Sequence, residues 1–276
     1  MPAASLRPPS ALVAAQRPRP AQRRAARPAV VAVRAHGQAA GHGGGHGGAT
    51  AAPPTGFIAE MRTAAMKLHT REQAPKEGQK VAEKPAEQPV KKWTPTREGY
   101  LRFLVESKIV YDAIEDIIAN SDHPDLQRFQ NSGLERGAAL EKDIAWMKEK
   151  YGAEVGCSPE GCAACNGSSP GHTYASSLRK MAAESPTAFV CHYYNTYFAH
   201  TAGGLMIGKK MSDELLEGAT LEFYKWDGDV KEYLAAVRDQ INAAAEGWSQ
   251  EEKQACLDQT ADSFKAGGAL LGLVAS

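Results

Sequence analysis

The sequence predicts an all-α fold made of one multi-helical domain. Apolar residues recur at spacings of three and four from Phe57 to near the C-terminus, as on one face of a helix. Runs with the strict alternation of a half-buried strand are essentially absent. The roughly 220 residues from Phe57 onward suffice for one well-cored domain. We expect irregularly packed helices rather than a regular four-helix bundle.

Two segments of different composition precede this domain. Residues 1–35 contain seven arginines and no acidic residue, and the first acid in the chain is Glu60. An Arg-rich, acid-free segment without an uninterrupted apolar stretch is typical of an organelle transit peptide. Residues 31–35 (Val-Ala-Val-Arg-Ala) resemble a chloroplast cleavage site, which favours the plastid over the mitochondrion. Residues 36–55 predict a flexible Gly/His/Pro leader, and 56–276 the folded domain.

Net charge, hydropathy and cysteine content exclude several classes of binding partner and of structure. Without the seven arginines the chain keeps 25 basic against 32 acidic residues, a net charge of −7. This acidity argues against nucleic acid or an anionic membrane as a partner. No run of about 18 apolar residues occurs, so we predict no membrane span. Five cysteines, three of them clustered, argue against a disulfide framework.

The first predicted helix starts at Phe57. Its apolar positions Ile58, Met61, Ala65 and Leu68 share one face, and His69 continues that face. Residues 71–93 are rich in Lys, Glu and Pro and predict an exposed excursion.

The second predicted helix has Thr94 as N-cap and Pro95 in its first turn, and ends near Ser121. The elements expected after it are a helix over 134–151, a loop over 152–172, helices over 174–183 and from Pro186 past Tyr197, a short helix over 213–217, a turn over 225–228, and helices over 230–246 and 250–268.

Two adjacent glycines, Gly203 and Gly204, interrupt the helix that begins at Pro186. Each costs about 1 kcal/mol relative to alanine inside a helix. Such a pair predicts either a close helix–helix contact or a backbone that bends and approaches a flat, bulky ligand. His200 lies one turn before the pair. His69 is either a buried core histidine or a metal ligand, and Arg62 lies two turns before it on the same face.

The cysteine cluster Cys157, Cys162 and Cys165 leaves three interpretations open: a loop without chemistry, a redox-sensitive pair, or a metal site completed by His172. Cys191 and Cys256 fall on helical apolar patterns and predict buried thiols.

Several long motifs resemble the plastid haem oxygenases of plants and algae. The resemblance covers nearly all of 56–276 except the cysteine loop, and several motifs in the right order are more specific than any single one. These motifs span residues 56–70, 93–104, 131–136, 191–204 and 221–228.

The resemblance implies a haem held between a proximal and a kinked distal helix. It implies that His69 is the proximal iron ligand and that Gly203 and Gly204 lie over the distal face. His200 stands where animal members carry an aspartate that anchors distal water, which leaves open the group that organises protons. The remaining implied haem contacts are Arg62, Tyr194, Arg238 and Phe264, with Arg238 binding a propionate.

The activity implied by the resemblance is oxidative opening of haem b by O2 to biliverdin, CO and Fe2+. The chain has no GxGxxG after a strand, so we expect electrons from outside, and the donor implied for a plastid member is reduced ferredoxin. Basic candidates for its docking are Lys67, Arg97, Arg102, Lys209 and Lys210. We expect a monomer in the plastid stroma, with a downstream bilin reductase as a further candidate partner. The alternative is a non-catalytic haem- or tetrapyrrole-binding regulator on the same fold.

Overall fold

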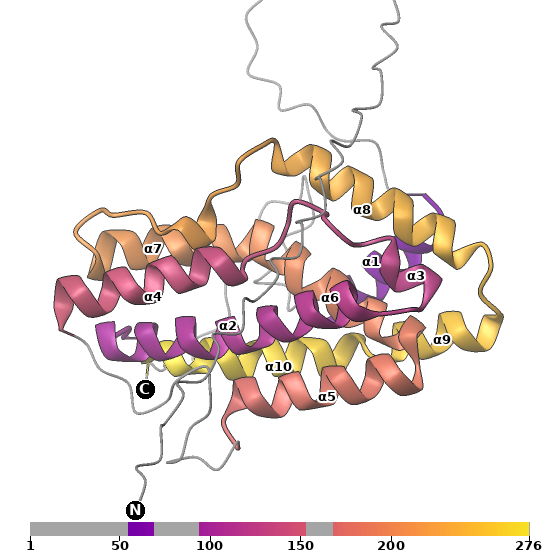
Figure 1. Cartoon of the computed structure of the whole chain (residues 1–276), viewed down its shortest axis with the longest axis horizontal. Coiled ribbons are helices and arrows are strands. Elements are labelled where there is room, and N and C mark those ends of the chain that lie inside the picture. Colours follow the sequence, from indigo (N-terminus) through magenta and orange to yellow (C-terminus); the bar gives the residue numbers. More distant parts are fainter. Residues whose placement is uncertain (1–54, 69–93, 153–167, 276) are drawn as a thin grey trace, which may run out of the picture. The chain divides into compact units, whose positions relative to one another are not determined.

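A computed structural model describes residues 55–68, 94–152 and 168–275. The chain divides into two units, residues 1–50 and 51–276, and every described residue belongs to the second unit. Within the described ranges all regular elements are helical, which confirms the predicted all-α class (Figure 1). None of the described helices is long and apolar enough to cross a membrane.

The described elements follow one another along the chain in a fixed order. They are α1 (Phe57–Leu68), α2 (Arg97–Asn120), α3 (Pro124–Gln127), α4 (Gly137–Tyr151), α5 (Pro170–Glu184), α6 (Pro186–Ala199), the π-helical turn η1 (His200–Gly204), α7 (Leu205–Leu215), the 3₁₀ turn η2 (Glu222–Tyr224), α8 (Val230–Ala245), α9 (Gln250–Asp258), α10 (Thr260–Gly272) and the 3₁₀ turn η3 (Leu273–Ala275).

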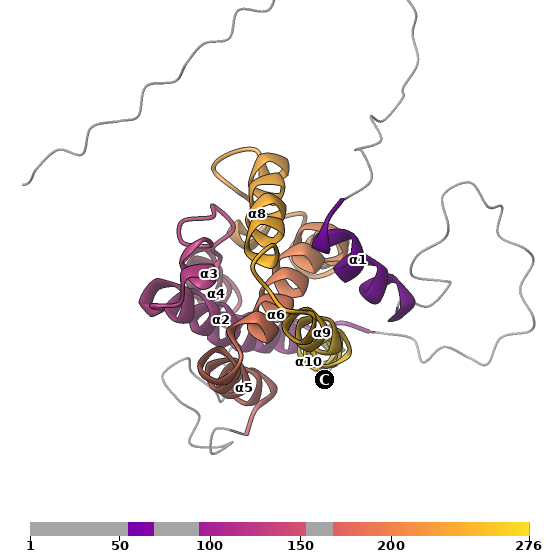
Figure 2. The same ribbon diagram turned by 90° about the vertical axis from the view of Figure 1, so that its right-hand side faces the viewer.

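Helices α2 and α6 carry much of the core. Helix α2 packs against α4, α5 and η3, whereas α6 packs against α5, α9 and α10. Figure 2 looks nearly along several of these helices and shows α6 among its neighbours. Phe189, Tyr193 and Tyr197 of α6 are among the largest fully buried side chains. Burial on most sides of α6 fixes the position of η1, which continues it.

Several predicted helix starts are wrong, one because a neighbouring threonine is the cap and others because a side chain from another helix binds the first N–H groups. The N-cap of α2 is Thr96, not Thr94, and Pro95 precedes the helix. The Thr96 hydroxyl accepts the N–H of Gly99 at 2.9 Å. Helix α4 starts three residues later than predicted, because the Glu115 carboxylate of α2 accepts the N–H groups of Arg136 and Gly137.

The predicted loop over 152–172 is too long at its C-terminal end. Helix α5 already begins at Pro170, where the buried Glu106 carboxylate accepts the Ser169 hydroxyl and the Gly171 N–H, each at 2.6 Å. A carboxylate at a helix N-terminus satisfies otherwise unpaired donors. The sequence pattern alone did not connect Glu106 with this helix.

Three further differences lie in the second half of the chain. Helix α3 was not predicted, α7 runs through 205–215 where only a short helix over 213–217 was expected, and the predicted helix over 250–268 is divided into α9 and α10 at Gln259. The Gln259 Oε1 atom lies 3.2 Å from His192 Nε2 of α6, a contact that accompanies this division.

Candidate haem site

The two glycines lie in a π-helical turn rather than in a break. Backbone dihedrals stay helical from His200 through Gly204 into Leu205, so α6, η1 and α7 form one continuous segment. Single π-turns widen a helix locally and are frequent at functional sites. The predicted irregularity is therefore present, in the form of a wide turn.

Gly203 and Gly204 have different surroundings. A Cβ atom at Gly203 would meet nothing within 4 Å, so this position borders open space. A Cβ atom at Gly204 would come within 3.0 Å of His200 Nδ1. The absent side chain at Gly204 makes room for the imidazole of its own segment, whereas Gly203 leaves an outer face of the helix bare.

His200 is buried and fixed by a hydrogen bond. Its Nε2 lies 2.8 Å from the carbonyl oxygen of Phe223, and its ring stacks on the Phe223 ring with centroids 4.0 Å apart. A carbonyl only accepts, so Nε2 carries the proton and donates it. Burial lowers the pKa of His200 to about 4, with a smaller lowering from the Arg136 guanidinium, while the bond to Phe223 opposes the shift. At neutral pH the imidazole is uncharged and Nδ1 has a free lone pair.

Sequence reasoning missed the partners of His200. The Phe223 carbonyl and Arg136 lie 23 and 64 residues away along the chain, and no residue next to His200 in the sequence points to them. The only signal was that residues 131–136 and 221–228 were both among the family-like motifs without an assigned role.

Helix α1 carries the predicted proximal side, and Phe57, Ile58 and Met61 are buried as predicted. Leu68 was placed on the same apolar face but is 45% exposed, and Met66 is 46% exposed. His69 follows directly but belongs to the undescribed range 69–93, so its role as iron ligand stays a prediction.

Exposed apolar side chains mark the segments predicted to enclose haem. Among the described residues the large hydrophobic side chains that are exposed are Met66 and Leu68 of α1 and Leu205 and Met206 of α7. Such groups are normally covered when they cluster. Met66 and Leu68 lie at the end of α1 and Leu205 and Met206 directly follow Gly204, so each of the two segments predicted to contact haem carries an exposed apolar pair.

Two arginines near Tyr194 fit the carboxylates of such a ligand. Burial raises the pKa of Tyr194 on α6, and the charges of Arg238 on α8 and Arg62 on α1 lower it in turn. The Arg238 guanidinium lies over the Phe198 ring at 4.9 Å. Neither arginine has a carboxylate partner in the described part of the chain. Guanidinium groups that are not already paired can bind propionates.

The other predicted haem contact, Phe264, is half-buried on α10, a helix that packs against α1. Cys191 and Cys256 are buried thiols, as predicted. Cys157, Cys162 and Cys165 belong to the undescribed range 153–167. His172 Nδ1 is 2.8 Å from the Ser169 hydroxyl.

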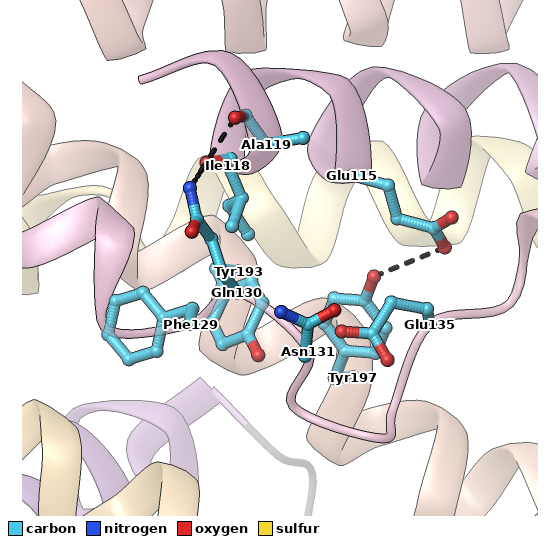
Figure 3. A pocket seen from close by; sticks show the side chains of 9 residues that line it. All are labelled: Glu115, Ile118, Ala119, Phe129, Gln130, Asn131, Glu135, Tyr193 and Tyr197. Carbon is cyan, nitrogen blue, oxygen red and sulfur yellow. Dashed lines mark hydrogen bonds between the residues drawn. The ribbon is translucent and has the colours of Figure 1, made fainter. Parts of the chain in front are cut away.

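A cavity of about 300 Å³ lies elsewhere, between α2, α6 and the segment before α4 (Figure 3). Glu115 and Tyr197 line it, with the Tyr197 hydroxyl 3.5 Å from the Glu115 carboxylate. Among the described residues, none of the predicted haem contacts lines this cavity.

Comparison with protein families and curated proteins gives one consistent result. The family model described as "Heme oxygenase" matches residues 57–271. The chain is 50% identical over 221 residues to "Heme oxygenase 1, chloroplastic" of Arabidopsis thaliana, covering 80% of this chain and 74% of that protein. It is 41% identical over 182 residues to "Probable inactive heme oxygenase 2, chloroplastic" of Oryza sativa subsp. japonica, covering 66% of this chain and 52% of that protein.

Solved structures share the fold. Heme oxygenase-1 of the cyanobacterium Synechocystis in complex with heme has a TM-score of 0.58 at 20% identity, covering 79% of this chain and 91% of that chain. Heme oxygenase 2 of Chlamydomonas reinhardtii without heme has a TM-score of 0.51 at 17% identity, covering 62% and 80%.

Proposed function

Because the chain belongs to the haem oxygenase family, we propose that residues 56–276 form a domain that binds haem b and opens it with O2 to biliverdin, CO and Fe2+. The haem oxygenase activity and the chloroplast location predicted from the sequence are confirmed by the plant relatives. Two observations together carry the residue-level proposal. Met66 and Leu68 of α1 are exposed, and the π-turn that begins at the buried His200 has open space beside Gly203.

We assign the haem contacts as follows. His69 would bind the iron, Arg238 and Arg62 the propionates, and Tyr194 and Phe264 would pack near the ring. Gly203 would let the helix backbone approach the distal face. Bound haem supplies the iron that activates O2 and is also the molecule that is oxidised.

His200 is assigned to orient distal water as a hydrogen-bond acceptor. Its Nε2–H is committed to the Phe223 carbonyl, so only Nδ1 is available. Because the pKa of His200 is about 4, the imidazolium form is scarcely populated at neutral pH, so the ring does not serve as the general acid. As a neutral acceptor, Nδ1 would hold a water molecule in place. A proton needed on the distal side would then come from that water rather than from the imidazole.

Reduced ferredoxin is the proposed electron donor, since residues 56–276 carry no fingerprint for a flavin or nicotinamide site. Ferredoxin is acidic and requires accessible cations. Lys209 and Lys210 of α7 are close to η1, but each forms an ion pair with an acid one turn later, Asp213 and Glu214. Docking would therefore exchange these local pairs for contacts with the partner.

The test mixes the purified domain with hemin. A Soret band that vanishes on addition of ferredoxin, its reductase, NADPH and O2 supports the enzyme, whereas a band that persists supports the non-catalytic binder. Absence of any Soret band contradicts both. Turnover with a chemical reductant but not with ferredoxin would exclude only the proposed donor. Turnover is expected, because the chain is more similar to heme oxygenase 1 than to the probable inactive relative.

A further inference from the structure

We infer that Asp143 is a positioning residue that fixes the tautomer of His200 by holding the Phe223 carbonyl in place; its catalytic relevance rests on the distal role proposed for His200. Asp143 lies on α4 and touches neither the predicted haem contacts nor His200 itself. Its connection to the site runs through the backbone of η2.

Helix α4 contacts η2 through Asp143. Asp143 is buried, with 3% of its surface exposed, and its two carboxylate oxygens accept the N–H groups of Glu222 at 2.8 Å and Phe223 at 2.7 Å. Both bonds have a charged acceptor, which makes them stronger than neutral ones. They fix the Glu222 and Phe223 amides that directly precede the Phe223 carbonyl in the chain, and so limit the directions in which this carbonyl can point.

Arg136 anchors the other end of the same segment. The buried Arg136 guanidinium donates to the Lys225 carbonyl through Nη1 and to the Leu134 carbonyl through Nε. It also lies over the Trp226 ring at 4.8 Å. The Phe223 carbonyl is therefore held between anchors on both sides, one anionic and one cationic.

The fixed Phe223 carbonyl in turn determines which ring nitrogen of His200 carries the proton. An imidazole without a fixed acceptor exchanges between its Nε2–H and Nδ1–H forms. The acceptor 2.8 Å from Nε2 selects the Nε2–H form and leaves Nδ1, beside Gly204, free to accept. The groups that face the ring are the aromatic side chains of Tyr111, Phe223, Tyr224 and Trp226, and the nearby charge is Arg136. None of these rings offers a competing strong acceptor, so the Phe223 carbonyl determines the tautomer of His200.

The experiment measures the histidine tautomers of the haem-free full chain by 15N NMR of the ring nitrogens. In the wild type we expect a protonated Nε2 and an unprotonated Nδ1 for His200. In Asp143→Asn one acceptor and the charge are lost, so the two nitrogen signals should move toward each other. Exchange of the Nε2 proton with solvent should accelerate at least about tenfold, the lower end expected for losing a hydrogen bond to a charged acceptor.

Two controls distinguish a specific effect on His200 from a general destabilisation of the fold. Glu222→Gln removes an exposed carboxylate from the same segment and its ion pair with Lys225 but leaves both backbone donors to Asp143, so the His200 signals should not change. His192, another buried histidine, is bonded to Tyr174 and Gln259 and should keep its signals in Asp143→Asn.

Unchanged His200 signals in a folded Asp143→Asn protein, or an equal change in Glu222→Gln, would overturn the inference. An Nδ1-protonated His200 in the wild type would overturn it even if the variant failed to fold. Because the protein is haem-free, neither result bears on haem turnover. Conversely, normal turnover of His200→Ala would remove His200 from the proposed function without changing these spectra.

Discussion

Helix α1 and the η1 turn are the two segments assigned to haem, and the protein holds them differently. Helix α1 is fixed at its start, where Phe57 packs edge-on against Trp248 and the Ile58 N–H is bonded to Asn242. Its end carries Met66 and Leu68 in exposed positions. In η1, by contrast, His200 is buried, stacked and hydrogen-bonded. The histidine that we propose for the distal side is therefore held in place by the protein itself, whereas the end of α1, which we propose for the proximal side, exposes apolar side chains.

The largest expected effect breaks the proximal side. His69→Ala should lower the rate of haem opening by more than the roughly 10–100-fold that loss of an outer-shell partner of a metal ligand costs, because the ligand itself is removed. The fold should stay intact, and added imidazole should restore part of the ligand spectrum. Circular dichroism, haem spectra and turnover check this, with His172→Ala as control. Full activity of His69→Ala would contradict the proximal assignment.

The second prediction tests the burial of the distal histidine. The folded-state pKa of His200 is about 4 and its ordinary value is 6.5. Between these values the unfolded state binds more protons, so the free energy of unfolding falls as pH drops from 6.5 to 4. This linkage amounts to about 2–3 kcal/mol.

Urea unfolding of wild type and His200→Gln at several pH values measures the difference. The variant lacks this titration and should lose correspondingly less stability in acid. The lowered pKa of His192 acts in the same direction in both proteins and cancels. Equal pH dependence of the two proteins would show that His200 is not buried in its neutral form.

The third prediction separates the two glycines. Gly203→Ala should stabilise the haem-free protein by up to about 1 kcal/mol, because helix propensity improves and no atom is displaced. Gly204→Ala should destabilise it by about 1–3 kcal/mol, because the methyl group overpacks against His200. Thermal unfolding without haem checks both. Haem affinity should nevertheless fall in Gly203→Ala, and destabilisation by that variant would contradict the open face.

The smallest predicted effect concerns the cations near Tyr194. Arg238→Ala should weaken haem binding about tenfold through loss of a charge-assisted bond to a propionate, and Arg62→Ala less, since it is exposed. Haem dimethyl ester, whose propionates are masked, should bind the wild type correspondingly more weakly and show no further loss in Arg238→Ala. Titrations followed by absorbance measure this. Arg128→Ala, which alters a surface pair with Asp125, is the control.

Local sequence signals located most helices but few of their exact ends. The apolar repeat around Phe57 and the Pro186 start were correct because propensity and spacing act within a few residues. The starts of α2, α4 and α5 depend on Thr96, on Glu115 and on Glu106 with Ser169, and the last two caps involve carboxylates from α2. No local pattern reveals a cap that comes from another helix.

By itself the sequence determined the all-α class, the family and the position of the irregular turn, because helical periodicity, long motifs and adjacent glycines are written in consecutive residues. Only the tertiary structure decided that Gly204 leaves room for the His200 imidazole while Gly203 borders open space. It also decided that Asp143 is connected to His200 through the backbone of Phe223. The reason is physical. A tautomer, a lowered pKa and a place for a side chain depend on which distant atoms lie within a few ångströms, and chain folding alone brings those atoms together.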